Sequence, residues 1–582
     1  MNRSDTVIAA TLSAGLVALL VPAARLGVDF HHDGIMLKPA LDVLSGQVLF
    51  RDTFMQYGAL TCYLQAVALW FQPTLLSIRL LNVAAYGVSL FFLYASWRLI
   101  LPRMLTLVAA GLFVLSIPAA EPNFYDGWLL LPWSSTLAMI FQSVALYAML
   151  RIIQSQQPER WGIVLGAACA SVFWCRQPVG LTMFASLVGI GFALQWAKWT
   201  PVRGSKRIIF GKIGAGFIAV HALFLINIKV SGAQAEWWYQ TFVWPKKWAG
   251  SSTWEAARNQ RDLFELNFSA GLGLLLLLAT LAAPNLARRF YPRFAERFTT
   301  AWWLCSAGVL LWQHESVLAW LHLRKGGWLI FIPLVVVLQA VRSLSQVFGQ
   351  SGRTRPSEYY LVAAMAAIAL ASLAQYFPVP DAPHASYSLA PAFGLFVFIC
   401  WRWVGHSPAV LGLAFATMFL PAILLKVHWA RQILGRPLVT LTHPDLLSGM
   451  RVSPQKARAI ADMAVAVEKI MSFRPTIPSV MQGMDALPLC LMHNLINPSP
   501  YFIRWGGLTD GAEDRQRSDY IQRARPLIFF QQGQWDKVGD FYRRHHYVPL
   551  LYIQETALEI AVPEEVAKAM GQSAYGLNPT KS

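Results

Sequence analysis

Long apolar runs recur along the chain and are separated by short polar segments. A transmembrane helix needs roughly 20 mostly apolar residues, and most of these runs are close to that length. Only 13% of the 582 residues are charged and 56% are hydrophobic, whereas a soluble protein carries about 25% charged residues. The pattern predicts a mainly α-helical, polytopic membrane bundle of about thirteen spans. The expected spans are 6–25, 76–98, 104–120, 129–150, 161–177, 179–197, 208–229, 266–284, 299–320, 326–341, 359–377, 388–403 and 408–428.

The polar segments differ in charge from one side of the predicted bundle to the other. The net charge is +18, and Lys and Arg concentrate in every second loop, which is the positive-inside pattern. This predicts a multi-pass membrane protein with a cytoplasmic N-terminus and a C-terminus on the outer side of the membrane. The first run resembles a signal peptide, but its cleavage site is loose, so we expect a retained helix. A nucleic-acid partner is not expected, because no soluble domain presents a basic face.

The character of the chain changes near residue 440. The stretch "SPQKARAIADMAVAVEKIMSF" has helical apolar spacing behind a Ser cap at Ser453, and "IPSVMQG", "RPLIFFQQG" and "VPLLYIQETALEIAV" are typical of buried strands. "WDKVGDFYRRHHY" suggests a further helix. We therefore expect a membrane domain over 1–430, with a first outer loop at 26–75. A small soluble α/β domain over 440–565 on the periplasmic side and a tail at 566–582 follow.

The first outer loop carries the densest set of polar groups, in "DFHHDGIMLKPALDVLSGQVLFRDTFMQYGAL". Two short apolar stretches within it suit helices lying in the membrane interface. Asp29 and Asp33 follow the first span, where partial desolvation raises the basicity of a carboxylate. Such a group suits a general base that deprotonates a hydroxyl, and Asp33 is the first candidate. Capping of the interfacial helix is the alternative role for Asp33.

The adjacent histidines His31 and His32 could bind either a polar substrate or a metal ion. Neighbouring residues point in different directions, and no second ligand pair has metal spacing. Hydrogen bonding to substrate is therefore the favoured role. No metal or other cofactor is predicted, and the sequence leaves open whether the protein needs a divalent ion.

Three further outer segments contain candidate binding residues. Asp126 lies beside aromatic residues in "PAAEPNFYDGWLLLPW", which suits either a turn or a sugar site. Arg176 in "FWCRQPVG" lies at or inside the membrane boundary, where an ionisable residue is either functional or an interfacial helix end. Asp381 and His384 follow a Pro-rich turn in "QYFPVPDAPHASYSLAP" and belong to a structured turn or to a site.

A cationic pair on the outer side, Arg324 and Lys325, runs against the positive-inside trend. The pair could hold an anion such as a lipid phosphate, or it could anchor to headgroups. The sequence contains no GxxxxGK[ST] loop and no GxSxG motif. "GAGFIA" from Gly214 lies in a membrane span and indicates helix packing through small residues. No nucleotide site is expected.

Together these segments resemble the GT-C superfamily of integral membrane glycosyltransferases. The stretch "HHDG…LDVLSGQVLFRDTFMQYGAL" resembles the "HDG…G…lyrD…yG" form of the first loop in bacterial members, and "CRQPVG" and "QYFPVPDAPH" resemble recurring segments. The usual adjacent acidic pair is absent, because Gly34 follows Asp33, which leaves open whether Asp29 or Asp33 is the base.

The resemblance implies transfer of a sugar from a polyprenyl-phosphate donor to a hydroxyl of an envelope glycan, lipid or protein, with Asp33 as base. It implies that Arg176, Arg324 and Lys325 stabilise the leaving lipid phosphate. The other residues expected to bind substrate are His31, His32, Tyr57, Asp126, Asp381 and His384. Two other functions stay open: a flippase of lipid-linked glycans, which would favour broken helices and midplane charges, and a polymerase or ligase of envelope glycans.

Overall fold

The computed structural model describes most of the chain. The residues described are 2–117, 130–154, 157–196, 205–246, 357–376, 382–404, 426–482, 487–491, 511–531, 545–553 and 558–571, with short pieces at 423–424 and between 290 and 342. The predicted spans at 266–284, 299–320, 326–341 and most of 408–428 lie outside these residues.

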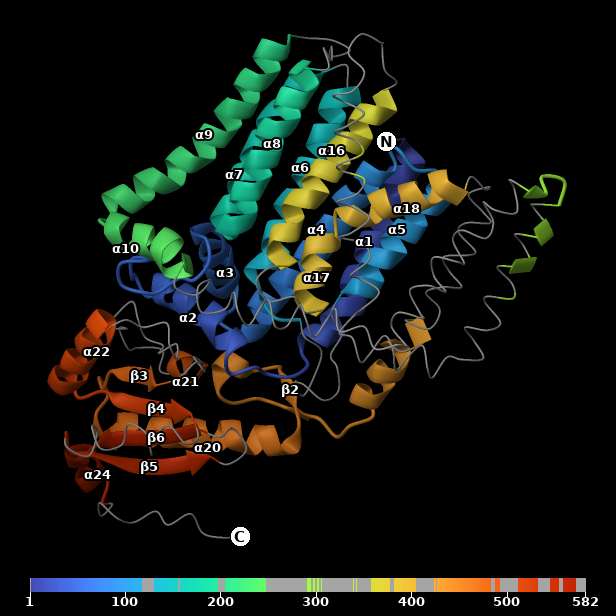
Figure 1. Ribbon diagram of the computed structural model, residues 1–582. Helices are drawn as coiled ribbons and strands as arrows, with labels where there is room; N and C mark the ends of the chain where they lie inside the picture. The colour runs from blue at the N-terminus through green and yellow to red at the C-terminus, as the bar shows by residue number, and fades with distance from the viewer. Residues whose placement is uncertain are drawn as a thin grey trace.

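A bundle of long apolar helices forms the larger part of the molecule (Figure 1). Successive helices alternate in direction, so every second connection lies at the same end. Five of the described helices are long and apolar enough to cross a membrane: α1, α4, α6, α9 and the helical stretch that includes α16. The bundle helices are α1 (Arg3–Ala24), α4 (Leu75–Trp97), α5 (Arg103–Ser116), α6 (Ser134–Gln154), α7 (Pro158–Cys175), α8 (Gln177–Trp196), α9 (Lys206–Val230), α16 (Ser357–Ser372) and α18 (Ala392–Val404).

Most predicted spans in the described residues coincide with one helix each, within a few residues. The expected span at 388–403 differs, because α17 (Ala382–Leu389) ends just inside it and α18 begins only at Ala392. Pro391 lies between the two helices and cannot donate the backbone hydrogen bond that a continuous helix requires. His384 therefore lies on a short helix and not in a turn.

The first loop folds into two short helices, as predicted. They are α2 (His32–Leu44) and α3 (Ala59–Phe71), and they pack together at the end of the bundle opposite the N-terminus, here called the first-loop end (Figure 1). The short helices α10 (Gln234–Trp238) and η1 (Tyr239–Val243) lie beside them. Gln240 of η1 accepts the N–H of Met55 at 2.9 Å and donates to the carbonyl of Phe50 at 2.8 Å, which holds the loop between α2 and α3 in place.

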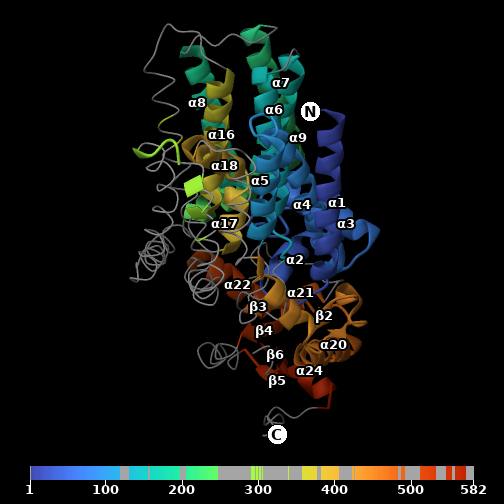
Figure 2. The same ribbon diagram turned by 90° about the vertical axis from the view of Figure 1, so that its right-hand side faces the viewer.

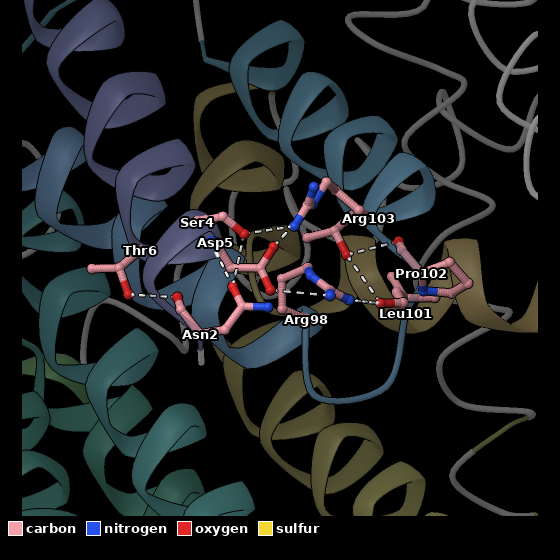
Figure 3. Close-up of polar contacts among 9 residues, drawn as sticks. Asn2, Ser4, Asp5, Thr6, Arg98, Leu101, Pro102 and Arg103 are labelled. Carbon is pink, nitrogen blue, oxygen red and sulfur yellow. Dashed lines mark hydrogen bonds and ion pairs between the residues drawn. The ribbon is translucent and has the colours of Figure 1, made fainter.

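At the other end of the bundle, Asp5 joins the start of α1 to the turn between α4 and α5 (Figure 3). Its carboxylate receives Nη2 of Arg98 at 3.1 Å and Nε of Arg103 at 3.0 Å. Asp5 is buried, so the two guanidinium groups compensate the cost of removing its charge from water. Because cations also begin α1, α5 and α9, we call this the basic end.

Helices α7 and α9 approach closely through a small residue in the predicted packing segment. A Cβ on Gly216 would lie 2.3 Å from the carbonyl oxygen of Ile163 on α7, whereas a Cβ on Gly214 would meet nothing within 4 Å. Gly216 therefore lets the two backbones meet, together with Gly166 of α7, where a Cβ would lie 1.9 Å from the carbonyl oxygen of Ile213.

The last part of the chain forms a four-stranded mixed sheet below the first-loop end (Figure 2). The strand order is β3-β4-β6-β5; β3 and β4 are parallel, and the other neighbours are antiparallel. The elements of this part are β1 (Val439–Thr440), η4 (Asp445–Leu447), β2 (Arg451–Val452), α20 (Pro454–Phe473), β3 (Ser479–Gln482), α21 (Leu487–Cys490), α22 (Gly511–Ala524), β4 (Leu527–Gln531), β5 (Tyr547–Ile553), β6 (Leu558–Pro563) and α24 (Glu564–Ala569).

The predicted helix behind Ser453 is confirmed, with the Ser453 hydroxyl accepting the N–H of Lys456 at 3.3 Å. The three predicted strand segments are also confirmed, and the last of them contains two strands. Pro549 lies beside an irregularity in the register of β5, an edge strand of this sheet, where a missing N–H is tolerated. Most of the predicted helix at 535–547 lies outside the described residues, and Tyr547 begins β5.

Candidate active site

Two aspartates organise the entry into α2 by reciprocal hydrogen bonds. Oδ1 of Asp29 accepts the backbone N–H of His32 at 2.5 Å, and Oδ2 of Asp33 accepts the backbone N–H of Asp29 at 2.8 Å. This exchange resembles a capping box, in which side chains satisfy the unpaired N–H groups at a helix start. Both carboxylates are therefore part of one tightly ordered turn directly after α1.

Asp33 points into the interior and pairs with Arg79 of α4. Oδ2 of Asp33 lies 2.5 Å from Nη2 of Arg79, and the two side chains are 0% and 2% exposed. Arg79 also donates to the carbonyls of Ala24 and Leu26, which are among the groups left unpaired at the end of α1. Burial raises the pKa of Asp33, and the Arg79 charge opposes this rise. The general-base role of Asp33 stays a prediction. Its carboxylate is enclosed by the groups that it pairs with.

Asp29 lies closer to the surface and pairs with an imidazole. Its Oδ1 lies 3.1 Å from Nδ1 of His32, and the side chains are 9% and 25% exposed. Burial by itself raises the pKa of Asp29, but hydrogen bonds and charge from His32 outweigh that effect and lower it from 3.8 to about 2. The carboxylate is therefore ionised at neutral pH and is directed at the imidazole.

Aromatic rings from three separate segments gather around Trp133, the residue before α6. His32 lies 5.4 Å from Trp133 between ring centroids, His384 of α17 lies 5.0 Å away, and Tyr57 lies 6.4 Å away. His31 contacts the His32 ring edge-on at 4.5 Å. The result is a compact group of rings beside an ionised carboxylate, a combination that suits a sugar with apolar C–H faces and hydroxyl groups.

Arg176 brings a positive charge to the same group from the end of α7. Its guanidinium carbon lies 5.5 Å from the centroid of the Tyr57 ring, and Nη1 lies 3.4 Å from the Ser134 hydroxyl. The guanidinium thus lies over an aromatic face in cation–π geometry. Burial raises the pKa of Tyr57 although the Arg176 charge opposes it, so this phenol is neutral at physiological pH.

A close contact of backbones keeps Tyr57 beside Arg176. The N–H of Gly58 donates to the carbonyl of Cys175 at 3.1 Å. A Cβ at position 58 would lie 2.0 Å from the carbonyl oxygen of Trp174, so only glycine fits here. The residues on either side, Tyr57 and Arg176, are placed by this contact.

The C-terminal part of the chain also contacts the turn that carries Asp29 and Asp33, here called the acidic turn. Nζ of Lys456 on α20 lies 5.6 Å from the ring centroid of Phe30, and the N–H of Leu487 donates to the Phe30 carbonyl at 3.0 Å. The backbone of Arg451 exchanges hydrogen bonds with Arg25 at 2.6 Å and Gly27 at 2.8 Å. The turn that carries Asp29 therefore has a rigid support on both sides.

The structure brings together six of the residues that the sequence singled out: Asp29, His31, His32, Tyr57, Arg176 and His384. Asp33 lies behind them, and Asp126, Arg324, Lys325 and Asp381 lie outside the described residues. Trp133 and Arg79 were not identified in advance. Among the described residues, no three His, Cys, Asp or Glu side chains are grouped so as to hold a metal ion.

No model of a known protein family matches the chain, and a search of curated proteins finds no match. Among solved structures, the Archaeoglobus fulgidus oligosaccharyltransferase, in a complex with Zn and sulfate, matches at 11% identity over 96% of this chain and 73% of that chain, with a TM-score of 0.47. The archaeal oligosaccharyltransferase AglB from Archaeoglobus fulgidus, with an inhibitory peptide and a dolichol-phosphate, matches at 12% identity over 99% and 75%, also with a TM-score of 0.47.

ArnT from Cupriavidus metallidurans, bound to undecaprenyl phosphate, matches at 12% identity over 96% of this chain and 98% of that chain, with a TM-score of 0.41. These structural neighbours are GT-C glycosyltransferases, the superfamily that the first loop resembles. At identities of 11 to 12% and TM-scores below 0.5, the likeness does not extend to activity or to the roles of single residues.

Proposed function

We propose that the protein is a membrane glycosyltransferase that moves a sugar from a polyprenyl-phosphate donor to a hydroxyl of a cell-envelope acceptor. The observation that carries this proposal is the convergence of Asp29, His32, Trp133 and Arg176 at one end of an apolar helix bundle. A carboxylate–imidazole pair can accept a proton, an aromatic platform can hold a sugar and a guanidinium can stabilise a leaving phosphate. The resemblance of the first loop to GT-C enzymes supports the same activity.

The distribution of charge supports a periplasmic location for the reaction. Cations concentrate at the basic end, which the positive-inside rule assigns to the cytoplasm. The first-loop end and the sheet of the C-terminal part would then face the periplasm of a bacterial inner-membrane protein. In this arrangement residues 440–565 form a periplasmic domain next to the acidic turn.

Each group in the cluster has a distinct task in the proposed transfer. The acceptor oxygen forms a bond to the anomeric carbon, while the bond from that carbon to the donor phosphate breaks and its electron pair goes to the phosphate. Arg176 would stabilise the charge that develops on the lipid phosphate, and Trp133 would stack on the sugar. Arg324, Lys325, Asp126 and Asp381 are proposed to add phosphate and sugar contacts, as the resemblance implies.

The position of Asp29 favours it over Asp33 as the carboxylate that serves the reaction. A catalytic group has to come within hydrogen-bond reach of the reacting atoms or of their proton carrier. Asp29 is in contact with the exposed part of the cluster through His32, whereas Asp33 is enclosed by Arg79 and the turn. Asp33 would then act by holding the turn in shape.

The test is to incubate purified protein with a panel of polyprenyl-phosphate sugars and envelope acceptors, with and without EDTA, and to measure polyprenyl phosphate release. If the wild type releases polyprenyl phosphate and Asp29→Asn does not, the proposal is supported. If EDTA abolishes the release by the wild type, the reaction also needs a divalent ion. Movement of lipid-linked sugar across a vesicle membrane without release would instead identify a flippase. Transfer of preassembled chains alone would identify a polymerase or ligase.

A further inference from the structure

The carboxylate of Asp29 is poorly suited to keep a proton in the proposed reaction. Its Oδ1 already accepts two contacts from His32, the backbone N–H at 2.5 Å and ring Nδ1 at 3.1 Å. The same contacts hold the pKa of Asp29 at about 2, whereas an efficient proton acceptor titrates near the working pH. A second group in the cluster is therefore needed to receive the proton.

The contact between Asp29 and His32 assigns the protons of the imidazole ring. An ionised carboxylate only accepts hydrogen bonds, so Nδ1 of His32 carries the hydrogen that faces Oδ1. In the neutral ring, Nε2 then carries the lone pair, which is the arrangement by which a carboxylate orients an imidazole base. Histidine is also the side chain that most often serves as a general base.

The side chains around the His32 imidazole ring fix its orientation. Trp133 lies against it at a centroid distance of 5.4 Å and an interplanar angle of 34°, and His31 meets it edge-on at 74°. The His32 side chain is 25% exposed and that of Asp29 only 9%, so the imidazole is the outer member of the pair. A substrate on the Trp133 platform would meet the ring before it met the carboxylate.

We propose, building on the glycosyl transfer proposed above, that Nε2 of His32 accepts the proton of the acceptor hydroxyl and that Asp29 is a positioning residue for the His32 ring. As the acceptor oxygen bonds to the anomeric carbon, its proton moves to Nε2, and the electron pair of the broken bond leaves with the polyprenyl phosphate. The imidazolium is stabilised by the Asp29 carboxylate and then releases its proton to water.

The test is chemical rescue with a donor that the wild type cleaves. We expect His32→Ala to lose about 10²–10⁴-fold in kcat, with little change in the KM for the donor, and added imidazole to restore part of the rate in a saturable way. Asp29→Asn should also lose kcat, because its amide can donate to Nδ1 and so favour the wrong tautomer. His443→Gln, at an exposed histidine of the C-terminal part that pairs with Glu468, is the control and should keep the wild-type rate.

Two results would overturn the role of His32. One is a His32→Ala enzyme with the wild-type kcat. The other is a combination of two results. Imidazole does not raise the rate of a slow His32→Ala enzyme that still binds polyprenyl phosphate, whereas formate restores the rate of Asp29→Ala. Both differ from failure of the proposed function itself, in which the wild type releases polyprenyl phosphate from no donor.

Discussion

The carboxylate of Asp33 and the guanidinium of Arg79 form an ion pair with an Oδ2–Nη2 distance of 2.5 Å, in which both side chains are almost wholly buried. Arg79 also binds the last carbonyls of α1. One side chain of α4 thus fastens the end of α1 to the start of α2. The turn that carries Asp29 and Asp33 is built on this pair, which connects the stability of the bundle to the geometry of the candidate site.

Replacing Arg79 by methionine should destabilise the protein strongly, because it leaves the buried Asp33 carboxylate without a cationic partner. The expected loss is about 3–5 kcal/mol in the free energy of unfolding, measured by denaturation in detergent. Arg402→Met is the matched control, since the Arg402–Glu358 pair is 54% and 40% exposed and should contribute at most about 1 kcal/mol. The double change Arg79→Met with Asp33→Leu should recover much of the loss, and failure to recover would contradict this explanation.

Adding a methyl group at Gly58 should disturb the site without touching any charged residue. In Gly58→Ala the new Cβ would overlap the Trp174 carbonyl, so the loop has to move and Tyr57 moves away from Arg176. Overpacking of this kind costs about 1–3 kcal/mol, and a displacement near 1 Å can reduce the rate about 10²-fold. Gly15→Ala is the control, because its Cβ would meet nothing within 4 Å. Equal activity in the two variants would argue against the Gly58 contact.

Removing the charge of Arg176 should slow the chemical step. We expect Arg176→Gln to reduce kcat by about 10²–10³-fold if the guanidinium stabilises the leaving phosphate. Arg176→Lys should recover only part of the rate, because an ammonium lacks the planar fork of guanidinium. The measurement is polyprenyl phosphate release under single-turnover conditions, with Arg402→Gln as the surface control. An unchanged kcat in Arg176→Gln would confine Arg176 to a structural role.

Acid should weaken the contribution of Asp29 to stability in a defined range of pH. The folded pKa of about 2 lies below the ordinary value of 3.8, so the stabilisation is complete above 3.8 and is lost as the pH falls through 2. A shift of roughly 2 units corresponds to roughly 2–3 kcal/mol. The difference in unfolding free energy between wild type and Asp29→Asn should therefore decrease between about pH 4 and 2. A difference that does not change with pH would contradict the Asp29–His32 ion pair.

The long apolar runs predicted the bundle well because lipid-facing surface dominates them. Helix α9 (Lys206–Val230) has many exposed apolar side chains and coincides with the predicted span at 208–229 within two residues. The break between α17 and α18 was missed because hydropathy alone does not register the lost N–H of Pro391. Apolar content thus locates a span more reliably than it locates an interruption within one.

The membership of the site was partly predictable, but its geometry was not. Alternation of the spans assigns Asp29 and Arg176 to the same side of the membrane, yet only the packing of α6 against α7 brings Trp133 and Arg176 together. Arg79 was not identified, although its position within the predicted span at 76–98 was the signal that could have marked it, because an intramembrane cation is a functional candidate. Its pairing with Asp33 decides which aspartate faces the cluster, and no local pattern carries that information.

The backbone hydrogen bonds that Arg451 donates to Arg25 and accepts from Gly27 join the acidic turn to a segment that is synthesised much later. During synthesis the acidic turn leaves the ribosome long before the segment that supports it. A nascent chain can insert its first helices into the membrane before the C-terminal segment is present to support the acidic turn. If the proposed function holds, we expect activity only once the last quarter of the chain has been synthesised, and a product that ends before Arg451 should occupy the bilayer without releasing polyprenyl phosphate.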